Sequence, residues 1–337
     1  MQNIFLFLGQ EMDLLASKEV KNGLAVALIG VGLYLVRKYF AGGVCRSKVQ
    51  LDGKVVLITG ANTGIGKEAA IDLGKRGAKV YIACRDPERG ALAVQDIKKK
   101  SKNENIHLRI LDLASFESIR SFTENFLREE PTLHILINNA GLLGCPNKKT
   151  KDGLEMTMGV NHYGHFLLTN LLLDVIKASS PSRIINVSSA GHQTGVIDFE
   201  DLGGEKVKEP FYLYSNSKLA NILFTKELSN RLTGTGVSVF SLHPGTVVTE
   251  IWRDLFTGKS ILYRILVSIL ALFILPLMKN AKQGAQTTIF CAVEEGLESQ
   301  TGEYFKDCRV KAPILPEQDH EVARKLWEVS ENLVGLS

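Results

Sequence analysis

The sequence predicts an α/β protein, in which helices cover both faces of a doubly wound parallel sheet, behind an apolar N-terminal helix. Three observations predict this architecture. From about residue 50, short apolar runs alternate with helix-length segments, as buried parallel strands alternate with their crossover helices. A glycine-rich turn at residues 59–66 follows the first run, and a separate uncharged run covers residues 23–36.

The apolar run at 23–36 predicts a membrane anchor. As a helix it would span roughly 21 Å, and the basic residues Lys21, Arg37 and Lys38 flank it. The acidic residues before it make a poor signal-peptide start, so we favour an anchor over a cleaved signal or a buried helix. Basic residues downstream place the body on the cytosolic side. Residues 1–49 are therefore read as anchor and linker.

A second apolar stretch covers residues 261–278. Pro276 and the globular pattern after it argue against a second membrane span. We expect a membrane-proximal segment that lies on the bilayer or lines an apolar substrate mouth.

The body of the chain, residues 50–337, is predicted to be one domain, because no repeat or linker interrupts the alternation. The predicted strands are 54–60, 79–85, 108–113, 133–141, 183–191 and 237–245, with 302–308 as a candidate seventh. The predicted helices include 67–77, 119–130, 164–179 and 214–232.

Composition and charge narrow the function classes. Of the 337 residues, 45% are hydrophobic and the net charge is +4, so a core can form and nucleic acid is not an expected partner. Five scattered cysteines without a C-x-x-C pair favour a reducing compartment over disulfides or zinc. We expect no metal, and read His162 and His165 as non-ligands.

The turn TGANTGIG, residues 59–66, is typical of a Rossmann-type nucleotide site. Gly60 lets the chain leave the strand, Gly64 lets backbone approach a pyrophosphate, and Gly66 allows close helix packing. The N-terminus of the following helix attracts phosphate. The cofactor contacts predicted here are Gly60, Asn62, Thr63, Gly64, Ile65 and Gly66.

The second strand ends in CRD, which bears on the choice between NAD and NADP. A carboxylate at this position would hold a ribose hydroxyl, whereas an arginine would pair with a 2′-phosphate. Arg85 comes first after the strand, so we favour Arg85 and NADP(H). Asp86, before Pro87, is then a turn residue.

Two further strand ends are candidates for the cofactor site. Asp112 could accept a hydrogen bond from the adenine amine, and otherwise reads as a cap or turn residue. Asn139, within NNAG at 138–141, belongs to a strand exit whose small residues would let backbone lie against a flat ligand. Both fall at the carboxyl ends of parallel strands, where ligands bind in such sheets.

The stretch YSNSK, residues 214–218, places a phenol and an ammonium one helical turn apart. Alone, Tyr214 and Lys218 also read as an ordinary helix surface. Their order after TG-x3-GIG, NNAG and a Ser-Ser strand end, and before Pro244-Gly245, resembles the short-chain dehydrogenase/reductases. The resemblance runs from about residue 50 to the C-terminus.

Within that family, the stretches ACRD, VNHYGHF and HPGTV are similar to the membrane-bound retinol dehydrogenases (retinal reductases) of the endoplasmic reticulum. The resemblance implies that Tyr214 exchanges a proton with the substrate oxygen while Lys218 lowers its pKa and holds the nicotinamide ribose. It also implies that Ser189 binds the substrate oxygen. Asn161 would position Lys218 through water.

Three of the remaining assignments keep an alternative reading. Pro244, Gly245 and Thr249 would contact the nicotinamide end, although Thr249 also reads as a helix start. Ser189 could be a plain strand-end hydroxyl beside Ser188, and Asn161 could be an N-cap. Tyr163 and LYSNSK depart from the subfamily pattern beside the catalytic residues, which leaves the exact substrate open.

The resemblance implies an NADPH-dependent enzyme that interconverts retinal and retinol, anchored in the endoplasmic reticulum and facing the cytosol. Other lipid aldehydes or steroids are the alternative substrates, and a non-catalytic NADP(H)-binding membrane scaffold is the alternative function. A mitochondrial membrane or lipid droplet is the alternative location. The expected partners are a small apolar substrate and membrane lipid, with a homo-oligomer left open.

Overall fold

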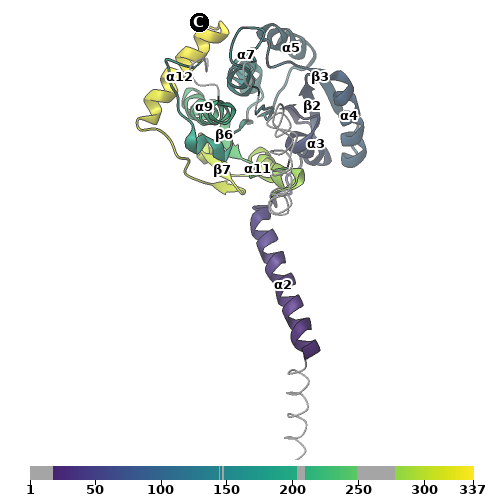
Figure 1. Cartoon of the computed structure of the whole chain (residues 1–337). Coiled ribbons are helices and arrows are strands. Elements are labelled where there is room, and N and C mark those ends of the chain that lie inside the picture. Colours follow the sequence, from purple (N-terminus) through teal and green to yellow (C-terminus); the bar gives the residue numbers. More distant parts are fainter. Residues whose placement is uncertain (1–17, 144, 146–147, 203–208, 249–277) are drawn as a thin grey trace, which may run out of the picture.

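The sheet runs through the middle of the globular body (Figure 1). The computed structural model describes residues 18–143, 145, 148–202, 209–248 and 278–337. In these residues the sheet has eight strands in the order β3-β2-β1-β4-β5-β6-β7-β8. The strands are β1 Val55–Thr59, β2 Lys79–Cys84, β3 Ile106–Ile110, β4 Ile135–Asn138, β5 Ser182–Val187, β6 Val237–His243, β7 Tyr304–Lys306 and β8 Arg309–Val310.

The strand order confirms the predicted doubly wound parallel sheet. Neighbouring strands from β3 to β7 pair in parallel, and only the β7–β8 pair is antiparallel. The candidate seventh strand is therefore a strand. β8, which has two exposed residues, was not predicted, and β3 begins two residues before the predicted 108.

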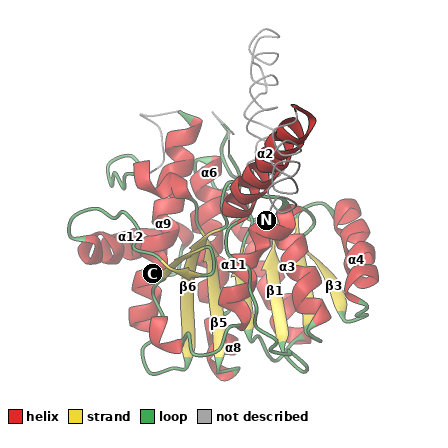
Figure 2. Cartoon of the chain, turned by 90° about the horizontal axis from the view of Figure 1, so that it is seen from below, coloured by secondary structure: helices red, strands yellow, loops and turns green. Residues whose placement is uncertain are grey.

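Helices cover both faces of the sheet (Figures 1 and 2). The helices of the described residues are α2 Lys18–Ala41, which covers neither face, and α3 Gly64–Lys75, α4 Pro87–Ser101, α5 Phe116–Glu129, α6 Met156–Met158, α7 Gly164–Leu171, α8 Leu173–Ala178, α9 Pro210–Arg231, α11 Ala281–Val293 and α12 Asp319–Val334. Among the described residues, three short turns are the π-helical η1 Gly159–Tyr163 and the 3-10 helices η2 Ala190–Thr194 and η5 Glu298–Gln300.

The core forms two layers that follow the period of the strands. Leu57 of β1 packs into the layer under α5, α7, α9 and α12, whereas its neighbours Val56 and Ile58 pack under α3, α4 and α11. Successive side chains of a strand point to opposite faces. Runs that are apolar at every position therefore fill both layers. Because the strands from β3 to β7 are parallel, their carboxyl ends lie along one edge of the sheet.

The N-terminal helix α2 projects away from the domain beside α11 (Figures 1 and 2). Residues Val20–Ala41 are long and apolar enough to cross a membrane, and none of that window is buried against the protein. The helix extends beyond the predicted 23–36 at both ends. Of the predicted membrane-proximal segment, 261–278, all but Met278 lies outside the described residues.

Candidate active site

The tyrosine, lysine and serine of the predicted proton-transfer site meet at the carboxyl end of β5. Tyr214 and Lys218 lie one turn apart in α9, and the Lys218 ammonium is 5.6 Å from the centre of the Tyr214 ring. Ser189 lies two residues beyond β5 and is the N-cap residue of η2. Lys218 is only 2% exposed, and its Nζ donates a 3.0 Å hydrogen bond to the Val187 carbonyl.

Burial sets the proton affinities of this pair. It raises the pKa of the Tyr214 phenol above its ordinary value, and a hydrogen bond with Ser189 partly opposes the rise. It lowers the pKa of the Lys218 ammonium to about 8. The sequence led us to expect a lowered tyrosine pKa. In the protein alone the desolvation of the phenol outweighs the hydrogen bond with Ser189, so the pKa is raised instead.

Asn161 lies inside the π-helical turn η1, so it is not the N-cap that was its alternative reading. Its Oδ1 accepts a 2.8 Å hydrogen bond from the Leu142 N–H, and its Nδ2 donates to the Leu142 carbonyl and to Ser217. A Cβ added at Gly141 would lie 3.4 Å from Lys218 Nζ and 3.5 Å from Asn161 Oδ1. Asn161 and Lys218 therefore both border the small residue that ends NNAG.

The glycine turn has the shape that the sequence predicted. Gly60 and Gly64 have φ values of 65° and 57°, in the left-handed region that favours glycine. A Cβ at Gly66 would meet Asn139 Nδ2 at 2.5 Å and the Gly60 carbonyl at 2.9 Å. Asn62 and Thr63 complete the turn, and Ile65 is the second residue of α3.

Asn139 holds this turn through its side chain as well as its backbone. Its Nδ2 donates to the Thr59 and Gly60 carbonyls at 2.8 and 3.3 Å, and its N–H donates to Thr59 Oγ1. Thr59 Oγ1 also lies 2.8 Å from Nε2 of the buried His165. Sequence reasoning missed Thr59 and His165 as supports, because their contacts join residues 106 positions apart.

The start of α3 fits a bound phosphate group. Its N-cap Thr63 makes no side-chain hydrogen bond to the helix, whereas Asp86, Ser115, Glu209 and Asn280 cap the starts of α4, α5, α9 and α11. The N–H groups at a helix start need an acceptor, and an anion can supply it. Together with the left-handed glycines, this uncapped start suits a dinucleotide.

The remaining cofactor candidates surround the same edge. Arg85 is exposed immediately after β2, while Asp86 accepts hydrogen bonds from the N–H groups of Glu88 and Arg89 as the predicted turn residue. Asp112 lies two residues beyond β3, and its carboxylate accepts from the Ala114 N–H. Its alternative reading as a turn residue is thereby observed.

The Pro244–Gly245 turn leaves the carboxyl end of β6. Gly245 has a φ of 98°, which favours glycine. Thr249 lies outside the described residues. Among the residues that the structure does describe, no three His, Cys, Asp or Glu side chains are grouped to hold a metal ion.

His192 supports the loop that carries Ser189, and the sequence did not single it out. Its Nε2 accepts a 3.3 Å hydrogen bond from the Ile314 N–H, so its Nδ1 carries the proton and donates to the Ser189 carbonyl at 2.6 Å. His243 adds a second brace, because its Nδ1 accepts from the Ala190 N–H. Burial lowers the pKa of both imidazoles, which keeps them neutral.

We expect His192→Ala to lower kcat about tenfold by loosening Ser189, since small displacements of a reacting group are costly. Cofactor affinity should stay unchanged, and His192→Asn should restore part of the rate by donating to the Ser189 carbonyl. Steady-state kinetics beside His320→Ala, at an exposed histidine, provide the check. Equal losses in the Ala and Asn variants would contradict this role.

Comparisons with known proteins agree with this geometry. The short chain dehydrogenase family profile matches residues 54–260, more than half of the chain. Retinol dehydrogenase 11 of Mus musculus is 52% identical over 308 residues, covering 90% of this chain and 95% of that protein. Retinol dehydrogenase 12 of Homo sapiens is 50% identical over 301 residues, covering 89% and 92%.

Solved structures share the fold. An uncharacterized protein from Mycobacterium paratuberculosis superposes with a TM-score of 0.68 at 30% identity, covering 87% of this chain and 98% of that one. The RhlG/NADP active-site complex of Pseudomonas aeruginosa superposes with a TM-score of 0.60 at 25% identity, covering 76% and 95%.

Proposed function

Because this chain belongs to the short-chain dehydrogenase family, we propose that it is an NADPH-dependent reductase of retinal or a similar long apolar aldehyde. The juxtaposition of Tyr214, Lys218 and Ser189 at the carboxyl end of β5 carries the proposal. The names of its relatives, which are about half identical in sequence, support a retinoid substrate.

The proposed roles follow from the positions of the side chains. The bound nicotinamide nucleotide supplies the hydride that reaches the carbonyl carbon. Tyr214 donates its phenolic proton to the carbonyl oxygen, and Ser189 donates a hydrogen bond to the same oxygen. Lys218 stabilises the negative charge left on the phenolate. Asn161 holds the Leu142 backbone through hydrogen bonds, and the neighbouring Gly141 borders Lys218. The reverse reaction oxidises the alcohol.

The proposed cofactor site extends from the glycine turn to the Pro244–Gly245 turn. Gly60, Asn62, Thr63, Gly64, Ile65 and Gly66 would hold the phosphates, with Asp112 and Asn139 beside the adenine and the nicotinamide ribose, and Thr249 at the carboxamide. Asp86 caps α4 with its carboxylate. Arg85 is left as the exposed charge at the ribose position, which supports NADP(H) over NAD.

Arg85→Ala should raise the KM for NADPH about ten- to hundredfold, because one charge-assisted phosphate pair is lost. The KM for NADH should stay within about twofold, since NADH has no 2′-phosphate. Kinetics with both nucleotides measure the ratio, with Arg128→Ala at an exposed residue of α5 as the control. A parallel change for the two nucleotides would remove Arg85 from the 2′-phosphate site.

The anchor assignment is part of the same proposal. We propose that α2 inserts in the endoplasmic reticulum membrane with the domain in the cytosol, where an aldehyde dissolved in lipid can reach the site. Resistance to carbonate extraction would test insertion, and protease sensitivity of intact microsomes would test orientation. Fractionation separates this location from mitochondria and lipid droplets.

The deciding experiment measures NADPH oxidation by the detergent-solubilised full chain with all-trans-retinal, beside NADH and Tyr214→Phe. Turnover that needs Tyr214 and prefers NADPH supports the proposal. Activity on shorter aldehydes or steroids alone keeps the mechanism and replaces the substrate. Nucleotide binding without reduction of any carbonyl indicates the scaffold function instead.

A further inference from the structure

The base of α2 meets the Pro244–Gly245 turn in a cluster that no proposed catalytic step uses. Arg37, in the last part of α2, donates to the Met278 carbonyl at 2.8 Å and to Gln283 of α11 at 3.2 Å. The next residue after Met278 is Lys279, which is only 5% exposed. We call Lys279, Asp307 and the Gly42–Gly43 step of the linker the anchor junction.

Lys279 holds the Pro244–Gly245 turn with its side chain. Its Nζ donates to the Pro244 carbonyl at 3.2 Å and pairs with Asp307 Oδ1 at 2.6 Å. Its aliphatic stem covers the glycine, because a Cβ at Gly245 would lie 2.6 to 2.8 Å from Lys279 Cδ, Cε and Nζ. The ammonium therefore lies against the backbone of the turn.

The backbone of Lys279 holds the chain that follows the turn. Its N–H donates to the Thr246 carbonyl at 2.9 Å, and its carbonyl accepts from the Val248 N–H at 3.0 Å. These bonds form a parallel bridge between Val247 and Lys279. Any shift of Lys279 must therefore move residues 244–248 with it.

The linker after α2 packs on the other side of the same ion pair. A Cβ at Gly43 would collide with the Asp307 carbonyl, and one at Gly42 would collide with Asp307 Oδ1 and the Lys279 ammonium. Asp307 itself has a φ of 53°. The absence of side chains at both glycines lets the linker lie directly on the Lys279–Asp307 pair.

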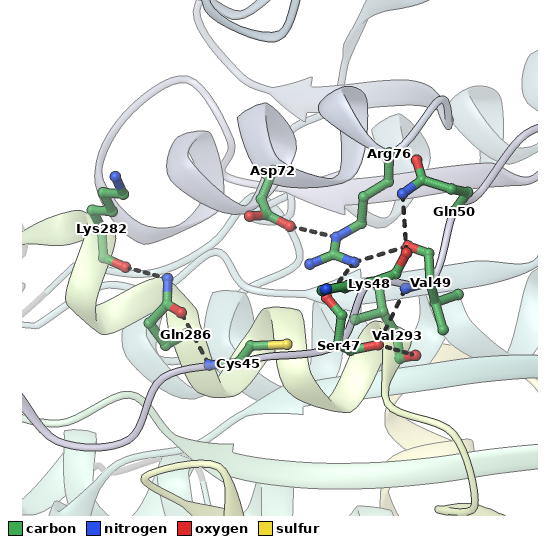
Figure 3. Close-up of polar contacts among 10 residues, drawn as sticks. All are labelled: Cys45, Ser47, Lys48, Val49, Gln50, Asp72, Arg76, Lys282, Gln286 and Val293. Atoms are coloured by element: carbon green, nitrogen blue, oxygen red, sulfur yellow. Dashed lines mark hydrogen bonds and ion pairs between the residues drawn. The ribbon is translucent and has the colours of Figure 1, made fainter.

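Further contacts fix the rest of the linker to the domain (Figure 3). Cys45 N–H donates to Gln286 of α11 at 3.1 Å, and Arg76 of the α3 terminus donates to the Ser47 and Val49 carbonyls at 3.0 and 2.8 Å. Asp72 holds the Arg76 guanidinium at 2.7 Å. The linker is therefore bound along its length and does not act as a loose tether.

We propose that Lys279 is a positioning residue, through which the anchor junction holds the Pro244–Gly245 turn in its nicotinamide-binding shape. This inference rests on the proposed nucleotide-binding function. It goes beyond it by making the base of the anchor helix part of the support of the cofactor site.

The first test replaces the ammonium and keeps the stem. Lys279→Met should weaken NADPH binding about tenfold, measured by nucleotide fluorescence on the full chain, whereas Lys279→Arg should stay within about threefold. Lys282→Met is the matched control, because Lys282 is exposed in α11. Asp307 keeps 32% side-chain exposure, so water can solvate its carboxylate once the lysine is gone.

The second test introduces a substitution in the linker. Gly43→Ala introduces the collision with Asp307 and should weaken NADPH binding as Lys279→Met does, whereas Gly32→Ala in α2 has nothing within 4 Å of its Cβ and should not. Unchanged NADPH affinity in both Lys279→Met and Gly43→Ala would overturn the inference. A wild-type chain that binds no nicotinamide nucleotide would overturn the proposed function itself.

Thermal unfolding without nucleotide separates positioning from a general loss of stability. If Lys279→Met fails to fold, Gly43→Ala decides alone, and unchanged NADPH affinity in that variant overturns the inference. Weaker binding in a variant with wild-type unfolding temperature supports positioning. NADPH binding that weakens only in proportion to the lost stability, with equal effects at the adenine and nicotinamide ends of the site, contradicts positioning.

Discussion

Replacing Tyr214 with Phe is expected to lower kcat for carbonyl reduction about a thousandfold, while the affinity for NADPH stays within about threefold. The change removes the phenolic proton and keeps the ring that packs beside Lys218 and Ser189. Without that proton, the alkoxide that forms after hydride arrival has only the Ser189 hydroxyl to stabilise it. Single-turnover kinetics with saturating NADPH measure the loss directly.

The control for this change is Tyr212→Phe, two residues earlier in the same helix. It removes a phenol of the same size outside the proposed site, so kcat should keep its wild-type value. If Tyr214→Phe retained more than about a tenth of wild-type kcat, another group would have to be the acid. Ser189 would then be the next candidate to test.

Lys218→Met is expected to abolish turnover and at the same time stabilise the nucleotide-free protein. Burial lowers the pKa of Lys218 to about 8 from 10.5, so the unfolded chain binds a proton more tightly than the folded one. Holding this ammonium in the folded protein costs about 3 kcal/mol at pH 7. Methionine fills similar volume without a charge, which removes that cost.

The lowered pKa of Lys218 also predicts the direction in which stability changes with pH. Between pH 8 and 10.5 the unfolded state carries more protons on Lys218 than the folded state does, so the contribution of Lys218 to wild-type stability should rise with pH in that window. The rise should be absent in Lys218→Met. Urea unfolding at pH 7 and near pH 10, with Lys282→Met as control, measures both effects; a Lys218→Met protein less stable than wild type at pH 7 would contradict the prediction.

The sequence predicted those parts of the fold that are encoded locally. The predicted strands 54–60 and 133–141 contain the short apolar runs VVLI and ILI, which are buried, and the positive φ values of Gly60 and Gly64 favour a residue without Cβ. The order of the motifs then placed Tyr214, Lys218 and Ser189 at one edge. β8 escaped prediction because its two residues, Arg309 and Val310, are exposed and carry no apolar pattern.

Contacts between residues that are distant in the sequence escaped prediction for a different reason. His192 joins Ser189 to Ile314, and Lys279 joins Pro244 to Asp307. His192, Ile314, Lys279 and Asp307 belong to no motif, and only the folded chain shows that they meet Ser189 and Pro244. The raised pKa of Tyr214 escaped likewise, because the degree of burial of a phenol depends on the whole fold around it.

The uncapped start of α3 has a consequence for how long the protein persists in a cell. The missing side-chain cap at its start and the buried Lys218 both leave the nucleotide-free chain less stable than the same fold with its site filled. A ligand at a hundred times its Kd adds about 2.7 kcal/mol to the stability of the folded state. Proteases degrade the unfolded fraction, so the abundance of this protein should follow the supply of its nucleotide.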